Sequence, residues 1–312
     1  MKRIIFYTES EWAFGSIHYE LSKYLFSHGV NAEVLPWNRQ YRKAEMTELA
    51  GMVDTFVTSP QGYTKLADHY KINPKRIIMI VHARLDLVDL IKQKGLGEFT
   101  KPKQLVVISK HLQLLAKELG VKRIPKLLYL GVNTDLYMTA PSTSLQTVGY
   151  AGAFHIREEF DDDLIDSDYQ AQNSLKRAYL VQEAAQKAGL KLRVAQLYHN
   201  SFVTMPGFYR KVDCVVVSSS QEGAGLPALE AAAAGRLVIS TPVGHWPERA
   251  LKGGGLSVPI DEKQFVAETA KLLLFYKDHP KEFAEKCRAI QKYAKGYDWN
   301  EVISDWIKLL AA

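Results

Sequence analysis

Cysteine is scarce in this 312-residue chain, which contains only Cys214 and Cys287. They lie far apart and show neither the spacing of a zinc site nor that of a redox motif, so a reducing cytoplasmic environment fits the sequence. Long apolar runs are also absent, since none approaches the ~20 residues that span a bilayer. Met1–Thr8 predicts a short strand and not a signal peptide. We therefore expect a cytoplasmic protein whose contact with a membrane, if any, is peripheral.

Excess charge is confined to the first part of the chain. Residues 1–140 contain 20 lysines and arginines against 13 acids, a net charge of +7, whereas the remaining residues contain 20 against 21 and carry a net −1. A basic half suits an anionic membrane surface, a phosphorylated acceptor or a nucleic acid. A solvated surface rich in lysine explains the same numbers. Since no nucleic-acid-binding motif is recognisable, a nucleic acid is the least favoured partner.

Short apolar strands alternate with amphipathic helices, a pattern typical of doubly wound parallel sheets. Two domains are expected, because single cores stop growing near ~250–300 residues. The polar, proline-containing break at 139–144 marks the boundary. We predict an α/β chain with domains at residues 1–140 and 145–296. The predicted strands are Arg3–Thr8, Ala32–Leu35, Thr55–Thr58, Arg76–His82, Leu105–Ser109, Thr147–Tyr150, Leu192–Gln196, Asp213–Ser218 and Leu237–Ser240.

The most informative segment is a glycine-rich turn between a strand and a helix, with two glutamates. Glu222 follows the apolar run of residues 212–220, and Glu230 lies in Pro227–Ala234, which has high helix propensity and a proline in its first turn. Such a turn directs backbone N–H groups and the positive end of a helix dipole at one point, which suits a phosphate. Carboxylates repel phosphate, so their natural partners are hydroxyls of a ribose or a sugar. The segment predicts a nucleotide-sugar site at the carboxyl end of the strand.

These residues resemble the retaining, family-4-type glycosyltransferases of the GT-B fold. Their Glu-x7-Glu motif appears here as Glu222-Gly-Ala-Gly-Leu226 to Glu230-Ala231, and the family's next segment, Gly-Gly-x-x-Glu, is similar to Gly244-His-Trp-Pro-Glu248. Strand, paired glycines, helix and second strand in this order make the resemblance far more specific than two spaced glutamates. Further similarity covers most of the chain, at Val107–Lys110, Leu130–Tyr137 and Val148–Gly152.

The resemblance implies two Rossmann-like domains that face each other across a cleft, with a last helix at about 297–312 packing back onto the first domain. It implies transfer of a sugar from a nucleoside diphosphate sugar to an acceptor hydroxyl of a glycan, lipid or small molecule. Retention of configuration is implied, and neither a metal nor another cofactor is expected. Two alternatives stay open: a glycosyltransferase that acts on modified DNA, and a catalytically silent nucleotide-sugar-binding protein.

The resemblance also assigns roles within the motif. Glu222 would contact hydroxyls of the donor sugar, and Glu230 would accept hydrogen bonds from the ribose. The backbone N–H groups of the turn would bind the diphosphate or sugar. Without the resemblance, Glu222 is a helix N-terminal acid and Glu230 a solvated helix position. The turn residues are Gly223, Ala224, Gly225 and Leu226.

The basic pair that neutralises the diphosphate in this family is altered here. Gly152 is followed by alanine where the family has Gly-Arg, and the family's Lys-Gly is replaced by Lys176-Arg177. We predict Lys176 as the retained lysine, and Arg157 or Arg177 as the substitute for the arginine. Arg157 belongs to an insert, residues 154–174, which is equally typical of a solvated loop.

Two more predictions concern the first half. His82 ends an apolar strand where the family often has a histidine near the donor sugar, although a structural role explains it as well. Gly15 is the remaining glycine of a loop where the family has two, so it would allow close approach of the donor. His18 is expected at the surface or the edge of the core. Asp161–Asp163 match a metal motif, but they lack the rigid strand end that coordination needs, so no metal is expected.

Overall fold

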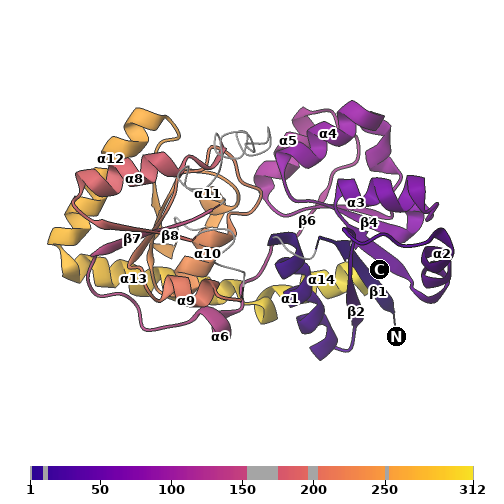
Figure 1. Cartoon of the computed structure of the whole chain (residues 1–312), viewed down its shortest axis with the longest axis horizontal. Helices are drawn as coiled ribbons and strands as arrows, with labels where there is room; N and C mark the ends of the chain where they lie inside the picture. The colour runs from indigo at the N-terminus through magenta and orange to yellow at the C-terminus, as the bar shows by residue number, and fades with distance from the viewer. Residues whose placement is uncertain (1, 10–12, 153–174, 196–202, 250–252, 312) are drawn as a thin grey trace. The chain divides into compact units, whose positions relative to one another are not determined.

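The structure is a computed structural model and describes residues 2–9, 13–152, 175–195, 203–249 and 253–311 (Figure 1). It divides into two compact units. Unit 1 contains Met1–Gly131 and Trp299–Ala312, and unit 2 contains Val132–Asp298. Within the described residues no helix combines the length and the apolar character that crossing a membrane requires.

The break between the units lies earlier than the sequence predicted, at residues 131–132 and not at 140–145. Hydrogen bonds explain the difference, because the polar segment 139–144 is fixed to unit 2. Thr139 Oγ1 donates to Ala234 O at 2.9 Å, and Ser142 Oγ donates to Asp213 Oδ1 at 2.6 Å. The polar composition that suggested a linker thus belongs to side chains with partners in unit 2.

Unit 1 is built on a parallel six-stranded sheet in the order β2-β1-β3-β4-β5-β6. Its strands are β1 Arg3–Thr8, β2 Asn31–Pro36, β3 Thr55–Thr58, β4 Ile77–Val81, β5 Gln104–Val107 and β6 Lys126–Leu127. Its helices are α1 Ala13–Ser27, α2 Lys43–Met52, α3 Pro60–Thr64, α4 Arg84–Lys94, α5 Lys110–Glu118 and α14 Trp299–Ala311, with shorter turns at Lys65–His69, Pro74–Arg76 and Leu96–Thr100.

Apolar residues explain why strand β4 and the last helix of unit 1 are buried where they are. Every residue of β4 is buried, as expected for a parallel strand that is covered on both faces. Helix α14 packs against α1, and Trp306 Nε1 donates to Tyr129 O at 3.0 Å. The final helix therefore belongs to the same unit as the first strands.

Unit 2 contains a parallel five-stranded sheet in the order β11-β10-β9-β7-β8. Its strands are β7 Thr147–Ala151, β8 Lys191–Ala195, β9 Cys214–Val217, β10 Leu237–Ser240 and β11 Leu256–Ser257. Its helices are α6 Thr134–Tyr137, α8 Ala178–Lys187, α9 Met205–Tyr209, α10 Leu226–Ala233, α11 Trp246–Arg249, α12 Glu262–Asp278 and α13 Pro280–Ala294, followed by a turn at Lys295–Tyr297.

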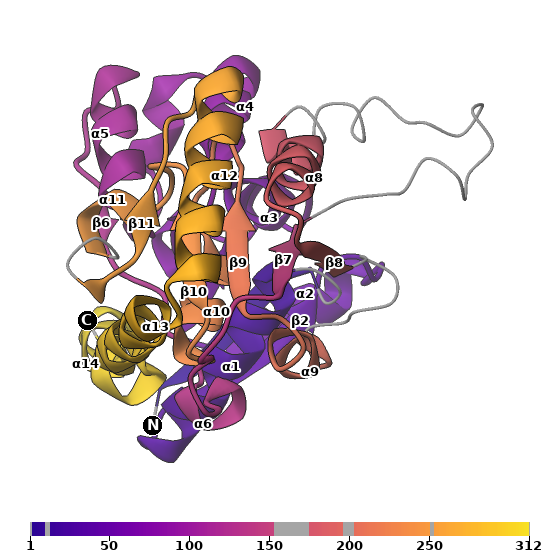
Figure 2. The ribbon, with the colours of Figure 1, turned by 90° about the vertical axis from the view of Figure 1, so that its left-hand side faces the viewer.

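Two hydrophobic cores cover the two faces of this sheet, because side chains alternate along each strand. Cys214 and Val216 of β9 face the core formed with α8 and α12, whereas Val215 and Val217 face the core formed with α9 and α10. Figure 2 shows α12 and α8 beside each other. Both units therefore have the α/β class that the sequence predicted.

The strand order of unit 2 determines where a ligand can bind. From β7 the chain runs through α8 to β8 on one side, and then crosses to β9 on the other side of β7. In open parallel sheets ligands bind at such a switch point, in the crevice outside the carboxyl ends of the strands. The residues that follow β9, together with those that open α8, are therefore candidates for the site.

Candidate functional site

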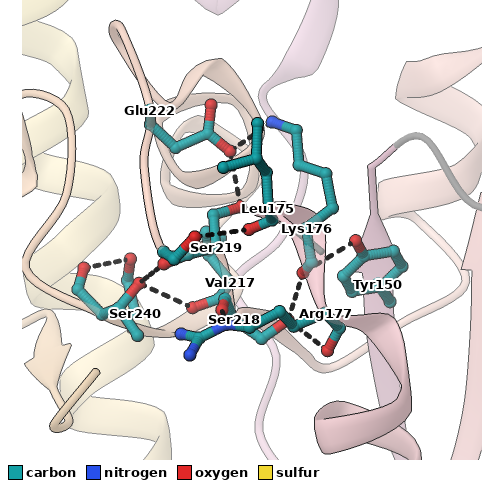
Figure 3. Close-up of polar contacts among 11 residues, drawn as sticks. Tyr150, Leu175, Lys176, Arg177, Val217, Ser218, Ser219, Glu222 and Ser240 are labelled. Carbon is teal, nitrogen blue, oxygen red and sulfur yellow. Dashed lines mark hydrogen bonds and ion pairs between the residues drawn. The ribbon is translucent and has the colours of Figure 1, made fainter. Parts of the chain in front are cut away.

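Two short segments meet at the switch point of unit 2 (Figure 3). One, residues 175–177, precedes α8, and the other, residues 218–222, follows β9. Ser220 N donates to Leu175 O at 2.8 Å, and Ser218 Oγ lies 2.7 Å from Lys176 O. These two hydrogen bonds, one from the backbone and one from a side chain, hold the two segments side by side.

Lys176 and Glu222 form an ion pair between the two segments. Lys176 Nζ contacts Glu222 Oε1, and Ser219 Oγ donates to the same carboxylate oxygen at 2.7 Å (Figure 3). The side chains are 27% and 13% exposed, so the pair is reachable from solvent. A lysine ammonium has three donors and a carboxylate about four acceptor sites. Both groups therefore retain capacity for a ligand, next to each other.

Tyr150, near the end of β7, is hydrogen-bonded to the backbone of Lys176. Its hydroxyl donates to Lys176 O at 3.2 Å. Burial raises the pKa of Tyr150, and the negative charge of Glu222 raises it further, so the phenol stays neutral and remains a donor. A Cβ on Gly152 would lie 2.7 Å from the Tyr150 hydroxyl, which explains a glycine there. The sequence did not predict Tyr150 or Ser219 as site residues, although Tyr150 lies in Val148–Gly152, one of the segments similar to the family.

Arg177 holds the end of β9. Its Nε donates to Ser218 O and its Nη1 to Ile260 O, both at 2.7 Å. The side chain is 5% exposed, and in Figure 3 its guanidinium is directed away from Glu222. Burial lowers the pKa of Arg177 below its usual value, although an arginine remains charged at neutral pH. This geometry favours a role in fixing the strand end over the predicted contact with the diphosphate.

The glycine-rich turn is shaped by two positive φ angles. Gly225, with φ +78°, directly precedes α10, so the backbone of Gly223–Leu226 surrounds the amino terminus of that helix. Gly244, with φ +61°, lies so close that a Cβ on it would be 2.7 Å from Ala224 O. The helix terminus offers N–H groups and a positive dipole end, the arrangement that binds phosphates.

Glu230 lies on α10 and is hydrogen-bonded within unit 2. Tyr209 donates its hydroxyl to Glu230 Oε2 at 2.7 Å, and the Tyr137 side chain makes a second hydrogen bond to the carboxyl group. Burial raises the pKa of Glu230, and these two hydrogen bonds lower it. Glu230 is thus no solvated helix position.

In unit 1, His82 follows β4 and is buried with its ring edge-on to His18, at 5.5 Å between centroids. Burial lowers the pKa of both rings, that of His18 to about 3, so both are neutral at pH 7. His18 stacks on Phe6 and lies in the core, deeper than the sequence predicted. Gly15 lies in α1, two residues after the helix begins. The predicted contacts of His82 and Gly15 with a donor remain predictions.

Two predicted features lie outside the described residues: Arg157 and the acidic run Asp161–Asp163. In the part of the chain that the structure describes, no group of three or more His, Cys, Asp or Glu side chains could hold a metal ion.

Residues 171–290 match the family described as glycosyl transferases group 1. The matched segment contains Lys176, Glu222 and Glu230. The lipopolysaccharide core biosynthesis mannosyltransferase LpsB of Rhizobium meliloti (strain 1021) is 30% identical over 120 residues, which are 38% of this chain and 33% of that protein. A D-inositol 3-phosphate glycosyltransferase of Arthrobacter sp. (strain FB24) is 35% identical over 95 residues, 30% of this chain and 22% of that protein. The chain therefore matches a third or less of the length of these relatives.

Solved structures match over the whole chain. Anabaena Alr3699/HepE in complex with UDP-glucose has a TM-score of 0.69 at 15% identity, covering 100% of both chains. The catalytic domain of Starch Synthase IV from Arabidopsis thaliana, bound to ADP and acarbose, has a TM-score of 0.66 at 12% identity, covering 99% of both chains. At these identities the likeness shows the fold alone. It is the GT-B fold, as the sequence predicted.

Proposed function

We propose that this protein is a retaining glycosyltransferase that moves a sugar from a nucleoside diphosphate sugar to an acceptor hydroxyl. The observation that carries the proposal is the contact between Lys176 and Glu222 at the switch point of a group 1 glycosyl transferase domain. A cation for the diphosphate and a carboxylate for sugar hydroxyls are thereby placed together. Two structural neighbours, one in complex with UDP-glucose and the other bound to ADP and acarbose, support a donor of this class.

Lys176 is proposed to stabilise the departing diphosphate. Its remaining donors would bind phosphate oxygens, and the amino terminus of α10 would add backbone N–H groups and dipole charge. Charge that a metal provides in other transferases would here come from these groups. A fixed cation beside the leaving group lowers the barrier, because it acts most strongly where charge develops.

Glu222 is proposed to orient the donor sugar. Lys176 and Ser219 fix one of its oxygens, so the carboxylate presents its remaining acceptor sites in a defined direction. Catalysis would rest on orientation and charge stabilisation, without a covalent sugar intermediate on the enzyme. The buried and neutral His82 would add a hydrogen bond rather than a charge.

For the acceptor we propose a glycan, a lipid or a small molecule. The basic first half of the chain would contact an anionic membrane.

Calorimetry with UDP, GDP, ADP and CMP, in the absence of metal, tests the donor site. Turnover of the matching sugar nucleotides is then compared between wild type and Glu222→Gln. We expect one diphosphate to bind, and Glu222→Gln to lose transfer and donor hydrolysis by about 10²–10³-fold. NMR of the product anomer tests retention. Binding without transfer or hydrolysis would leave only a nucleotide-sugar-binding protein. Absence of any binding would overturn the donor-site proposal as a whole.

A further inference from the structure

Glu230 is held by two tyrosines from two other helices. Tyr209, the last residue of α9, donates to Glu230 Oε2 at 2.7 Å, and Tyr137, the last residue of α6, bonds the same carboxyl group. The two rings pack together with centroids 5.8 Å apart. Tyr209 is 0% and Tyr137 7% exposed, so the tyrosines reach the carboxylate from inside the domain.

We propose that Tyr209 and Tyr137 are positioning residues that aim the Glu230 carboxylate at the vicinal hydroxyls of a ribose, and so make the donor site prefer ribonucleotides over 2′-deoxyribonucleotides. The inference rests on the proposed function, which gives Glu230 a nucleotide ribose as its ligand. A carboxylate offers about four acceptor sites. Two tyrosine hydroxyls occupy two of them, and the remaining two match the two hydroxyls of a ribose.

Arg236 fastens the segments that carry both tyrosines. This buried side chain donates from Nε to Tyr209 O at 2.9 Å and from Nη2 to Thr139 Oγ1 at 2.7 Å. Thr139 Oγ1 in turn donates to Ala234 O, next to the end of α10, at 2.9 Å. The helix that carries Glu230 and both tyrosine-bearing segments are thus tied at one point. Such support keeps an acceptor group within the narrow geometry that selective binding requires.

The short helix α6 is also fixed at its beginning. Asp298 Oδ2 accepts hydrogen bonds from Thr134 N at 3.0 Å and from Thr134 Oγ1 at 2.5 Å. Asn133 caps the helix by accepting from Leu136 N at 3.1 Å. Four residues would not hold a helix by themselves, so these contacts keep Tyr137 in place.

The tyrosines also affect the charge of the carboxyl group. Tyr209 from α9 and Tyr137 from α6 are titratable groups that hydrogen-bond the Glu230 carboxyl group, and burial raises the pKa of Tyr209, which therefore stays a neutral donor. Their hydrogen bonds counteract the effect of burial on Glu230 and favour the ionised form. Only that form can accept from both ribose hydroxyls while it is bound to two phenols.

Calorimetry with UDP and 2′-deoxy-UDP, and with ADP and 2′-deoxy-ADP, tests the proposal. Wild type should prefer the ribonucleotide of the pair that binds by about tenfold or more, as expected for one or two hydrogen bonds to a charged group. Tyr209→Phe and Tyr137→Phe keep the rings but remove the hydroxyls, and should each reduce this preference severalfold. Tyr276→Phe, a buried tyrosine of α12 in the other core of the same unit, should leave it unchanged.

The outcomes separate this inference from the proposed function. If wild type binds none of these four nucleotides and neither GDP nor CMP, the proposed function fails and the inference fails with it. If wild type binds but does not distinguish ribose from deoxyribose, only the inference is overturned. The same holds if both phenylalanine variants lose thermal stability yet keep the preference of wild type, because the tyrosines then only support the fold. Two separate variants keep the test valid should one of them fold poorly.

Discussion

Lys176 donates to Glu222 Oε1 although the two residues are 46 positions apart in sequence. The contact joins the start of α8 to the segment after β9, on the two sides of the switch point. The pair therefore depends on the strand order of unit 2, and any change that shifts β9 against β7 would separate the cation from the carboxylate.

Replacing Lys176 by alanine should lower kcat/KM by about 10²–10³-fold, the loss typical when a group that stabilises transition-state charge is removed. The free energy of unfolding should fall by less than about 1 kcal/mol, because the pair is partly exposed and screened by solvent. Steady-state kinetics and urea unfolding measure the two effects. Lys187→Ala, which removes an exposed lysine of α8 paired with Glu183, should change neither. A loss of activity no larger than that of this control would contradict the assigned role.

Gly244→Ala should weaken nucleotide binding and destabilise unit 2. An added Cβ would lie 2.7 Å from Ala224 O, and φ is +61°, so the turn before α10 must move. We expect a cost of about 1–3 kcal/mol in the free energy of unfolding. Gly51→Ala in α2 meets no atom within 4 Å, and should stabilise the protein by up to about 1 kcal/mol. Chemical unfolding of both variants should give opposite signs, and a Gly244→Ala protein as stable as wild type would count against the close approach.

Sequence patterns predicted the framework of the site well where strong local determinants exist. Pro227 in the first turn and Gly235 just after the end delimit α10, and the apolar run before Ser218 predicted β9. The boundary between units was missed, because composition cannot show that Thr139 and Ser142 have partners in unit 2. A hydrogen-bonded polar segment and a linker look alike in sequence.

Partners of the predicted residues were harder to foresee. Tyr209 reaches Glu230 across 21 positions, and Tyr137 comes from a different helix. Neither spacing corresponds to one face of a helix or strand, so periodicity does not indicate the contact. Arg177 lies beside Lys176 in sequence, yet its side chain bonds the carbonyls of Ser218 and Ile260. Arg177 also has a left-handed backbone conformation, with φ +51°, which its residue type does not indicate.

The pH dependence of stability should reveal His18. Its pKa is about 3 in the folded protein because of burial, against about 6.5 when unfolded. The unfolded state binds the extra proton between these values, so stability is complete above pH 6.5 and falls as the pH decreases toward 3. From pH 7.5 to 5.5 this residue should lower the free energy of unfolding by about 1–1.5 kcal/mol.

Urea titrations at both pH values, followed by tryptophan fluorescence, measure this change. His18→Phe should show a smaller loss than wild type. His82 faces His18 and is buried as well, so it adds a loss of the same sign in both proteins. His111→Gln, at an exposed position of α5, is the control. An equal pH dependence in wild type and His18→Phe would contradict a neutral, buried His18.

Arg177→Met separates structural support from donor binding. It removes the buried hydrogen bond to Ser218 O and the partly buried one to Ile260 O. Because both carbonyls then lose a partner, we expect a loss of about 2–4 kcal/mol in the free energy of unfolding. The affinity for the bound diphosphate, measured by calorimetry well below the unfolding temperature, should change less than about threefold, since a guanidinium directed away from Glu222 contributes little to binding. Arg193→Met, at an exposed position of β8, should alter neither quantity. A large loss of affinity with little loss of stability would instead make Arg177 the arginine that binds the diphosphate.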